Sequence, residues 1–135
     1  MNIIDKDTVS VDGNNPKRVE EEILICTLDG YQYFLGPEYD DELGWDDAKK
    51  WCESLGEGYE LPSRLVMLAI CVNEDTASAL LTEHSSYWTS AEVKGYATLA
   101  WLQQWCSGSP GLQGYASKSH LYRVRAVWRC QSGQR

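Results

Sequence analysis

The stretch that decides the fold lies near the end of the chain and reads SHLYRVRAVWRC, from Ser119 to Cys130. Successive side chains of a strand point to opposite faces. A strand with this composition favours a buried, central place in a sheet. We therefore expect it to close the domain, with its arginines held by the acidic first part of the chain. Its apolar face would carry Tyr122, Val124, Ala126 and Trp128, and its basic face Arg123, Arg125 and Arg129.

The charges are divided along the chain. All 20 acidic residues lie at or before Glu92, whereas six of the 12 basic residues follow it, beginning with Lys94. The division can attract a basic or an anionic partner, or the two parts can neutralise each other inside one fold. The last interpretation is favoured. Nucleic acid is not an expected partner, because the net charge of −8 and the pI of about 4.7 repel phosphate.

Length and composition indicate one globular domain. The chain has 135 residues, 43% of them hydrophobic, with six Trp and eight Tyr, which is enough for a single core. No run approaches the ~20 apolar residues of a membrane span, and the N-terminus lacks a signal-peptide pattern. We therefore expect a cytoplasmic protein with no membrane association, or alternatively a virion protein. A homo-oligomer is compatible with the sequence.

The cysteines show no spacing that is typical of a metal site. There are five of them, none in a CxxC pair, and only two histidines accompany them. No metal and no cofactor are predicted. Free buried thiols that pack as small apolar side chains are the favoured interpretation. The residues concerned are Cys26, Cys52, Cys71, Cys106, Cys130, His84 and His120.

The first third of the chain predicts a polar arm and then a hairpin. Residues 1–18 are polar and aperiodic, with at most a short strand around Thr8–Val11, and residues 19–135 would form the single domain. The apolar run Glu22–Leu28 stops at Asp29-Gly30 and resumes as Tyr31–Leu35 before Gly36-Pro37. Two such runs around Asp-Gly predict a β-hairpin.

Two helices are predicted next. The acidic stretch Glu38–Asp47 lacks the ligand spacing of a calcium loop and reads as a solvated helix entry, with Asp46 as the N-cap. The first helix would end at Gly56, and Ser63 would cap the second, with extra helical turns over Thr76–Thr82. The expected core stripes are Ala48, Trp51, Cys52 and Leu55 on the first helix, and Leu65, Leu68, Ala69 and Val72 on the second.

The rest of the chain predicts strands. Tyr87–Ala91 and Ala97–Trp105 alternate like strands, and a loop over Cys106–Gly114 separates them from the closing strand. A hairpin followed by two helices and further strands gives an α+β domain.

Four motifs occur in the order of a known family: Trp51-Cys52, GYELPS at 58–63, YWTS at 87–90 and YRVRAV at 122–127. Together they resemble the Lcl-type domain family of bacteria and phages, which has a C-type-lectin-like fold. The resemblance spans about residues 22–129. It implies an N-terminal hairpin and two helices packed on a mostly antiparallel sheet, with the terminal strands paired. It gives a structural role to Trp51, Cys52, Pro62, Trp88, Arg123, Arg125 and Trp128.

The chain departs from this family at two places. Tyr59-Glu60 stands where the family has Trp-Arg, and Ala126 stands where a cysteine often lies in the last strand. The family's disulfide is therefore in doubt, with Cys52–Cys130 as the remaining pairing. The implied pairing of the terminal strands would bring the three acidic residues at 20–22 near the three arginines. Those residues are Glu20, Glu21 and Glu22, opposite Arg123, Arg125 and Arg129.

No catalytic constellation is predicted. The calcium-binding sugar motifs of C-type lectins are absent, since Leu61 precedes Pro62, so any sugar binding would be calcium-independent. The same fold houses an oxidase with paired cysteines, which Cys106 alone does not reproduce. A hydrolase needs a base held beside its nucleophile. Neither His84, beside Ser85 and Ser86, nor His120 indicates such a pair.

The resulting hypothesis is a non-enzymatic binding module, phage- or prophage-encoded, that binds a host protein as an inhibitor or counter-defence factor. The loops between Ala91 and Lys118 would form the contact surface. The acidic stretch would meet a basic patch or mimic nucleic-acid charge. The alternative is a carbohydrate- or receptor-binding module of a virion. The candidate contact residues are Trp101, Trp105, Leu112, Tyr115, Asp40, Asp41 and Glu42.

Overall fold

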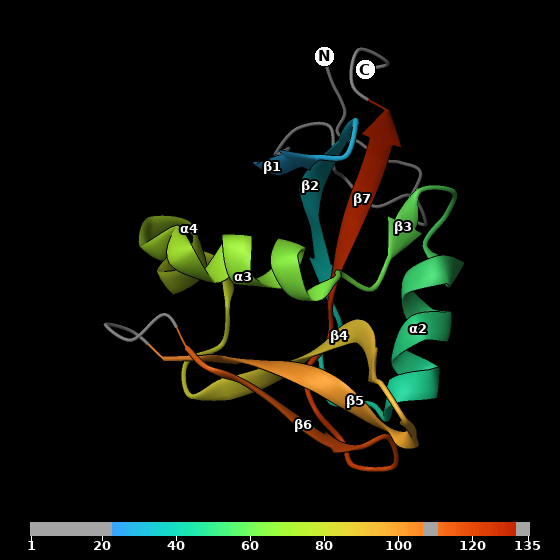
Figure 1. The fold of residues 1–135 in the computed structure, drawn as a ribbon. Helices are drawn as coiled ribbons and strands as arrows, with labels where there is room; N and C mark the ends of the chain where they lie inside the picture. The colour runs from blue at the N-terminus through green and yellow to red at the C-terminus, as the bar shows by residue number, and fades with distance from the viewer. Residues whose placement is uncertain (1–22, 107–110, 132–135) are drawn as a thin grey trace.

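The computed structural model describes residues 23–106 and 111–131, which form two antiparallel sheets and three helices (Figure 1). The larger sheet has the strand order β1-β2-β7-β3, and the smaller one has the order β4-β5-β6. Figure 1 shows α3 and α4 on one side of the pair of sheets and α2 on the other. The predicted arm over residues 1–18 and the strand at Thr8–Val11 lie outside the described residues. None of the described helices is long and apolar enough to span a membrane.

The closing strand, β7 (Arg125–Gln131), lies between β2 (Tyr31–Glu38) and β3 (Tyr59–Glu60). The predicted central position is therefore confirmed. The strand starts later than predicted, because the preceding residues pair elsewhere: Tyr122 forms a bridge with Leu43, and Arg123 forms one with Tyr87 of the other sheet. The chain thus crosses from one sheet to the other before β7 begins.

Each face of β7 packs against a different hydrophobic cluster. Val127 belongs to a cluster between the two sheets and α3, whereas Ala126 belongs to a cluster beneath α2. The first cluster consists of Leu35, Val66, Met67, Ile70, Cys71, Ala77, Leu81, Tyr87, Trp105 and Val127. The second consists of Trp45, Ala48, Cys52, Tyr59, Leu61, Trp88, Ala100, Leu102, Val124 and Ala126.

The predicted hairpin is confirmed as β1 (Leu24–Leu28) and β2, joined at Asp29-Gly30. Both turn residues have positive φ, 54° and 83°, which is the backbone that a tight two-residue hairpin turn requires. β2 continues through Gly36 and Pro37, where the prediction ended it. The register with β7 shifts between Leu35 and Glu38, and proline is tolerated at such an irregularity because no ladder donor is needed there.

The first predicted helix is α2 (Trp45–Ser54), which follows the acidic loop. The prediction of Asp46 as N-cap is wrong: Gly44 holds that position without a side-chain cap, and Asp46 lies in the first turn. Acidic residues are favourable there because they face the positive end of the helix dipole. Ala48 and Cys52 are buried as expected, and Trp51 packs at the cluster edge with its ring 5.2 Å from that of Tyr39.

The second predicted helix is α3 (Arg64–Val72), and Ser63 caps it as predicted, accepting a hydrogen bond from the amide of Val66 at 3.2 Å. The predicted core stripe is wrong. The buried side chains are Val66, Met67, Ile70 and Cys71, whereas Leu65 and Val72 are exposed. The helix is apolar around most of its circumference, so its sequence does not fix which stripe faces the core. The predicted extra turns form α4 (Glu74–Leu80).

The smaller sheet contains β4 (Ser85–Val93), β5 (Tyr96–Trp105) and β6 (Gln113–Ser117). The first two confirm predicted strands, and a tight turn with Gly95 at φ 86° joins them. β6 overlaps the end of the predicted loop. Its sequence, QGYAS, offers no apolar alternation, so only its pairing with β5 reveals it.

All five cysteines are free thiols, so the Cys52–Cys130 disulfide that the family resemblance left open is absent. Cys52 is buried, and burial raises the pKa of its thiol to about 12. Pro62 and Trp88 are also fully buried, and the Trp88 indole donates to the carbonyl of Leu43 at 2.8 Å. Trp128 packs on Phe34 with ring centroids 5.5 Å apart.

Candidate functional site

Two of the predicted contact residues, Trp101 and Tyr115, lie side by side on one face of the smaller sheet. They are direct cross-strand partners in β5 and β6. Their rings meet edge to face, with centroids 5.4 Å apart and an interplanar angle of 85°, an arrangement that aromatic pairs prefer. Tyr115 is 58% exposed. The strand pairing therefore presents an ordered aromatic pair to solvent.

Arg64, the first residue of α3, completes this surface. Its guanidinium carbon lies 3.8 Å from the centre of the Trp101 ring, within the range of a cation–π contact. Gln113 fixes the position of Arg64 through two hydrogen bonds. Its Oε1 accepts from the Nε of Arg64 at 2.7 Å, and its side-chain amide donates to the Arg64 carbonyl at 3.0 Å. The same amide donates to Oε1 of buried Gln103 at 2.8 Å. We call Arg64, Trp101 and Tyr115 the aromatic patch.

Sequence reasoning missed Arg64 because nothing local connects it with β5. Arg64 reaches Trp101 only because α3 packs its buried stripe across β5. This packing places the N-terminus of the helix over the Trp101 ring. Gln103 and Gln113 are likewise adjacent through strand pairing alone. The one signal in the sequence for a contact surface here was that Trp101 lies on a strand with alternating side chains.

The other two predicted aromatic and apolar anchors do not belong to this patch. Trp105 is only 1% exposed and packs in the core, so it is not available to a partner. Leu112 is 74% exposed. It precedes Gln113, and adjacent residues of an extended chain point to opposite faces, so Leu112 faces away from the side of Tyr115. It lines a separate cleft with His84 and Cys106.

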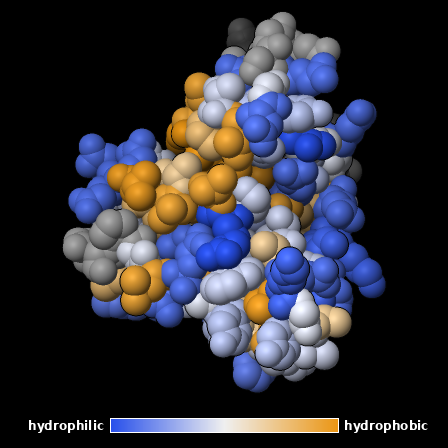
Figure 2. All heavy atoms as spheres, in the orientation of Figure 1, coloured by the Kyte–Doolittle hydropathy of each residue, from blue (hydrophilic) through white to orange (hydrophobic). Residues whose placement is uncertain are grey.

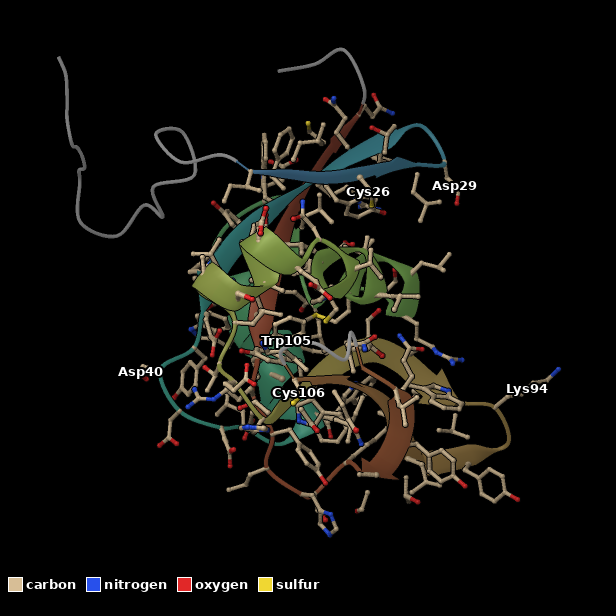
Figure 3. All side chains as sticks on the ribbon, turned by 90° about the vertical axis from the view of Figure 1, so that its left-hand side faces the viewer. Cys26, Asp29, Asp40, Lys94, Trp105 and Cys106 are labelled. Carbon is tan, nitrogen blue, oxygen red and sulfur yellow. The ribbon has the colours of Figure 1, made fainter. Side chains whose placement is uncertain are left out.

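The acidic candidates Asp40, Asp41 and Glu42 are all exposed in the segment between β2 and α2. The carboxylate of Asp41 accepts from the amide of Glu42 at 2.9 Å, which shapes the turn. In Figure 3, Asp40 lies on the opposite side of the view from Lys94 at the tip of the β4–β5 hairpin.

The arginines of the closing segment do not form an anion-binding surface. Arg123 and Arg125 contact the carboxylate of Glu38 at 3.3 and 3.4 Å, and Arg129 lies 3.8 Å from that of Glu60. The expectation that acidic residues of the first part of the chain hold them is confirmed. Glu38 is the end of β2 and is only 15% exposed, not part of a solvated helix entry. Glu20–Glu22 lie outside the described residues.

Apolar side chains are also exposed away from the aromatic patch. Figure 2 shows them gathered over α3 and beside β1 on the face that it presents. Leu24 of β1 and Leu65 and Val72 of α3 are about half or more exposed.

Comparison of the sequence with protein-family models and with curated proteins gives no match. Solved structures do match. EMS16, an antagonist of the collagen receptor integrin α2β1, has 11% identity and a TM-score of 0.54 over 76% of this chain and 94% of its own. The snake venom toxin convulxin has 14% identity and a TM-score of 0.53 over 78% and 95%. Rhodocetin has 11% identity and a TM-score of 0.51 over 78% and 94%.

These likenesses show the fold and nothing finer. The chain has the α+β C-type-lectin-like fold, in which the β1–β2 hairpin pairs with the last strand and the helices pack on antiparallel sheets. The expectation for the fold class is confirmed, including the pairing of the first and last parts of the domain.

Proposed function

We propose that this chain is a non-enzymatic protein-binding module whose contact surface is the aromatic patch. The observation that carries the proposal is the fixed stack of Arg64 on Trp101 beside exposed Tyr115. Arg, Trp and Tyr are the residue types most enriched at the energetic centres of protein interfaces. The hydrogen bond from Arg64 to Gln113 reduces the entropy that binding would cost, since the Arg64 side chain has little freedom left to lose.

A protein partner is favoured over a glycan by the position of Arg64. A sugar would stack its apolar face on an aromatic ring, and the guanidinium already covers one face of Trp101 at 3.8 Å. The fold supports the same choice by precedent, because EMS16 is an antagonist of an integrin receptor. Calcium-independent glycan binding remains the alternative, through the exposed ring of Tyr115.

We further propose a phage or prophage origin, a bacterial host protein as the target and the host cytoplasm as the place of action. Support comes from the resemblance of four motifs to the Lcl-type domain family. The acidic segment with Asp40, Asp41 and Glu42 is exposed and would meet a basic area of the target. Such a module would act as an inhibitor or counter-defence factor. A receptor-binding role on a virion is the second candidate.

The test is affinity capture from bacterial lysate with the purified chain and three variants. Trp101→Ala and Tyr115→Ala should each weaken capture of one stoichiometric protein by at least about tenfold, the loss expected for an interface anchor. Leu121→Ala is the matched control, because Leu121 is also well exposed but lies outside the aromatic patch. Its capture should equal that of the unaltered chain.

A glycan array with the same four proteins separates the alternatives. Retention on glycans that depends on Tyr115, with no protein captured, would support the carbohydrate-binding alternative. Capture that survives both aromatic substitutions would contradict the aromatic patch as the contact surface. Substitution of Asp40, Asp41 and Glu42 by their amides then tests the acidic segment as the contact surface.

A further inference from the structure

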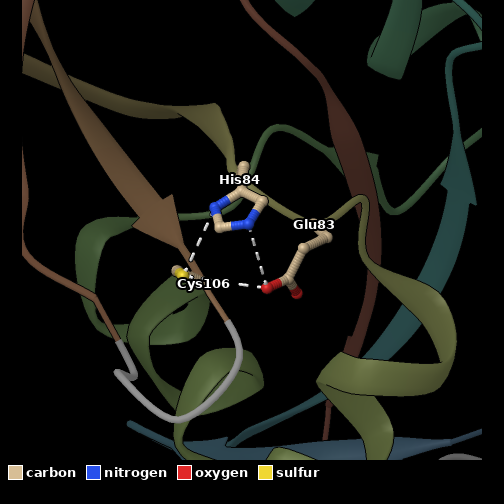
Figure 4. Close-up of side chains that lie close together, drawn as sticks. All are labelled: Glu83, His84 and Cys106. Carbon is tan, nitrogen blue, oxygen red and sulfur yellow. Dashed lines mark hydrogen bonds and ion pairs between the residues drawn. The ribbon is translucent and has the colours of Figure 1, made fainter.

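Three residues that the sequence does not connect meet at one end of the smaller sheet (Figure 4). The sulfur of Cys106 lies 3.4 Å from Nδ1 of His84 and 3.7 Å from Oε2 of Glu83. Nε2 of His84 lies 3.6 Å from the same Glu83 oxygen. One ligand atom from each residue lies within 4.8 Å of the others. A thiol, an imidazole and a carboxylate thus point to one place.

Strand pairing brings these residues together. Ser85, the first residue of β4, pairs with Trp105, the last residue of β5. The residues just beyond this pair, His84 and Cys106, are therefore opposite each other. His84 has a φ of 56°, a left-handed backbone that is uncommon for residues other than glycine and asparagine. The antiparallel ladder therefore places the imidazole and the thiol next to each other.

The two separations from the sulfur are close to those of ligands around a tetrahedral zinc ion, and the imidazole and carboxylate atoms lie within 4.8 Å of each other. Zinc binds sulfur at about 2.3 Å and nitrogen or oxygen at about 2.0–2.2 Å, so neighbouring ligand atoms lie roughly 3.3–3.6 Å apart. The observed distances from the Cys106 sulfur to its two neighbours are 3.4 and 3.7 Å. Calcium and magnesium prefer oxygen ligands only, whereas thiolate with imidazole selects zinc and its transition-metal neighbours.

The cluster borders a cleft of about 290 Å³, which gives an ion a path to it. Trp105 lines the same cleft, and its buried indole N–H has no acceptor among the described residues. A water molecule or anion on the metal would bring an acceptor to this cleft. The cleft is lined by His84, Ser85, Ser86, Gln104, Trp105, Cys106, Gly111 and Leu112.

A cysteine–histidine nucleophile is the competing interpretation of this geometry. An activated cysteine needs a positively charged surrounding that stabilises the thiolate. Here the charged group beside the sulfur is the carboxylate of Glu83, which is negative. The Glu83 carboxylate lies 3.6 Å from Nε2 of His84, as in a catalytic triad, but the same oxygen also lies 3.7 Å from the sulfur, where its negative charge opposes a bare thiolate. The arrangement suits a cation better than a nucleophile.

We propose that Glu83, His84 and Cys106 bind one Zn²⁺ ion, with Oε2, Nδ1 and Sγ as its ligands. Three protein ligands leave one coordination position, which opens toward the cleft and would hold water or a small anion. The ion would join the start of β4 to the residue after β5, next to exposed Leu112. Such a site goes beyond the proposed protein binding and does not depend on it.

The test titrates the reduced full chain with zinc by calorimetry. One ion per chain is expected. Cys106→Ala and His84→Asn should weaken binding by more than about 100-fold, because even outer-shell changes cost about 10–100-fold; Glu83→Gln should weaken it less. Asparagine tolerates the positive φ of His84. Cys130→Ala and His120→Asn are matched controls that remove the same side-chain types elsewhere and should bind like the unaltered chain.

Cobalt substitution gives a second, spectroscopic readout. A thiolate-to-cobalt charge-transfer band together with tetrahedral ligand-field bands is expected, and Cys106→Ala should abolish the charge-transfer band. Absence of zinc uptake at micromolar concentration would overturn the proposal. So would uptake that survives Cys106→Ala or is lost in Cys130→Ala. Circular dichroism of the metal-free variants verifies that each is folded.

Discussion

Glu38 and Arg125 are register partners at the end of the β2–β7 ladder, and their side chains meet with Oε1 3.4 Å from Nη1. The same carboxylate accepts from the Tyr87 hydroxyl at 3.0 Å and the Thr82 hydroxyl at 3.1 Å, and contacts Arg123 at 3.3 Å. One acidic side chain therefore connects the larger sheet, the smaller sheet and the segment after α4. Its substitution should affect the whole domain.

Glu38→Ala should lower the free energy of unfolding by about 3 kcal/mol, because it leaves partly buried guanidinium groups without their counter-charge. Urea denaturation measures this change. Glu42→Ala is the matched control: its side chain is exposed, and a change within about 0.5 kcal/mol is expected. Equal stability of the two variants would show that the network contributes little.

Replacing Arg123 and Arg125 together by Met should damage folding before it damages binding. Arg125 is 13% exposed and also donates to the carbonyl of Leu80 at 2.8 Å, so its loss removes that donor and the counter-charge of the Glu38 carboxylate. A fall in melting temperature with partner affinity retained by the folded fraction is expected. Loss of partner capture at an unchanged melting temperature would instead identify these arginines as contact residues.

A thiol titration should count five reactive thiols in denaturant and none consumed in a disulfide. Without denaturant, Cys52 and Cys71 should react only as fast as the domain opens, because both are fully buried and burial raises their pKa to about 12. Mass spectrometry of the labelled peptides distinguishes these two from Cys106. Rapid native labelling of Cys52 would contradict the burial described for α2.

Burial of Tyr87 should lower stability between about pH 10 and 12, in addition to the loss from the buried thiols of Cys52 and Cys71 that begins near pH 9. Burial raises the pKa of Tyr87 from 10.0 to about 12, so the unfolded chain releases this proton in a range where the folded protein keeps it. The unfolded state then binds fewer protons, and the free energy of unfolding falls as pH rises. Below pH 10 this contribution is constant. In urea denaturation across this range, Tyr87→Phe should show a shallower decline, whereas Tyr115→Phe removes an exposed hydroxyl and serves as control.

The core stripe of α3 can be tested with two substitutions of similar size. Ile70→Ala should cost about 2–5 kcal/mol because it opens a cavity in the cluster between the sheets. Leu65→Ala should cost no more than about 0.5 kcal/mol, since Leu65 is 62% exposed. Urea denaturation of both variants measures the two losses of unfolding free energy. A larger loss for Leu65→Ala than for Ile70→Ala would support the core stripe predicted from the sequence.

The features that the sequence predicted correctly depend on neighbouring residues. Asp29-Gly30 has the positive φ values that define its turn, and Ser63 caps the helix that begins at the next residue. The apolar and aromatic composition of the closing segment also predicted a central strand, and both faces of β7 do pack against hydrophobic clusters. Each of these signals is contained within a few positions.

The features that it missed depend on pairing between distant segments. The sequence does not determine which side of α3 faces the core, because Leu65 and Val66 are both apolar. Packing against the sheets buries Val66 and leaves Leu65 exposed. Arg64 reaches Trp101 through helix packing, and His84 reaches Cys106 through strand register. Neither the position of Arg64 in the aromatic patch nor the approach of His84 to Cys106 could therefore be predicted from neighbouring residues in the sequence.

The place of β7 between two hydrophobic clusters has a kinetic consequence. Phe34 pairs with Trp128, and neither cluster is complete before β7 is in position. Contacts between such distant parts of a chain close large loops, and proteins dominated by them fold slowly. During synthesis the helices and both hairpins would emerge with apolar surfaces open, and cooperative folding would wait until the last strand has left the ribosome. Chaperone dependence is therefore an expected property of this domain.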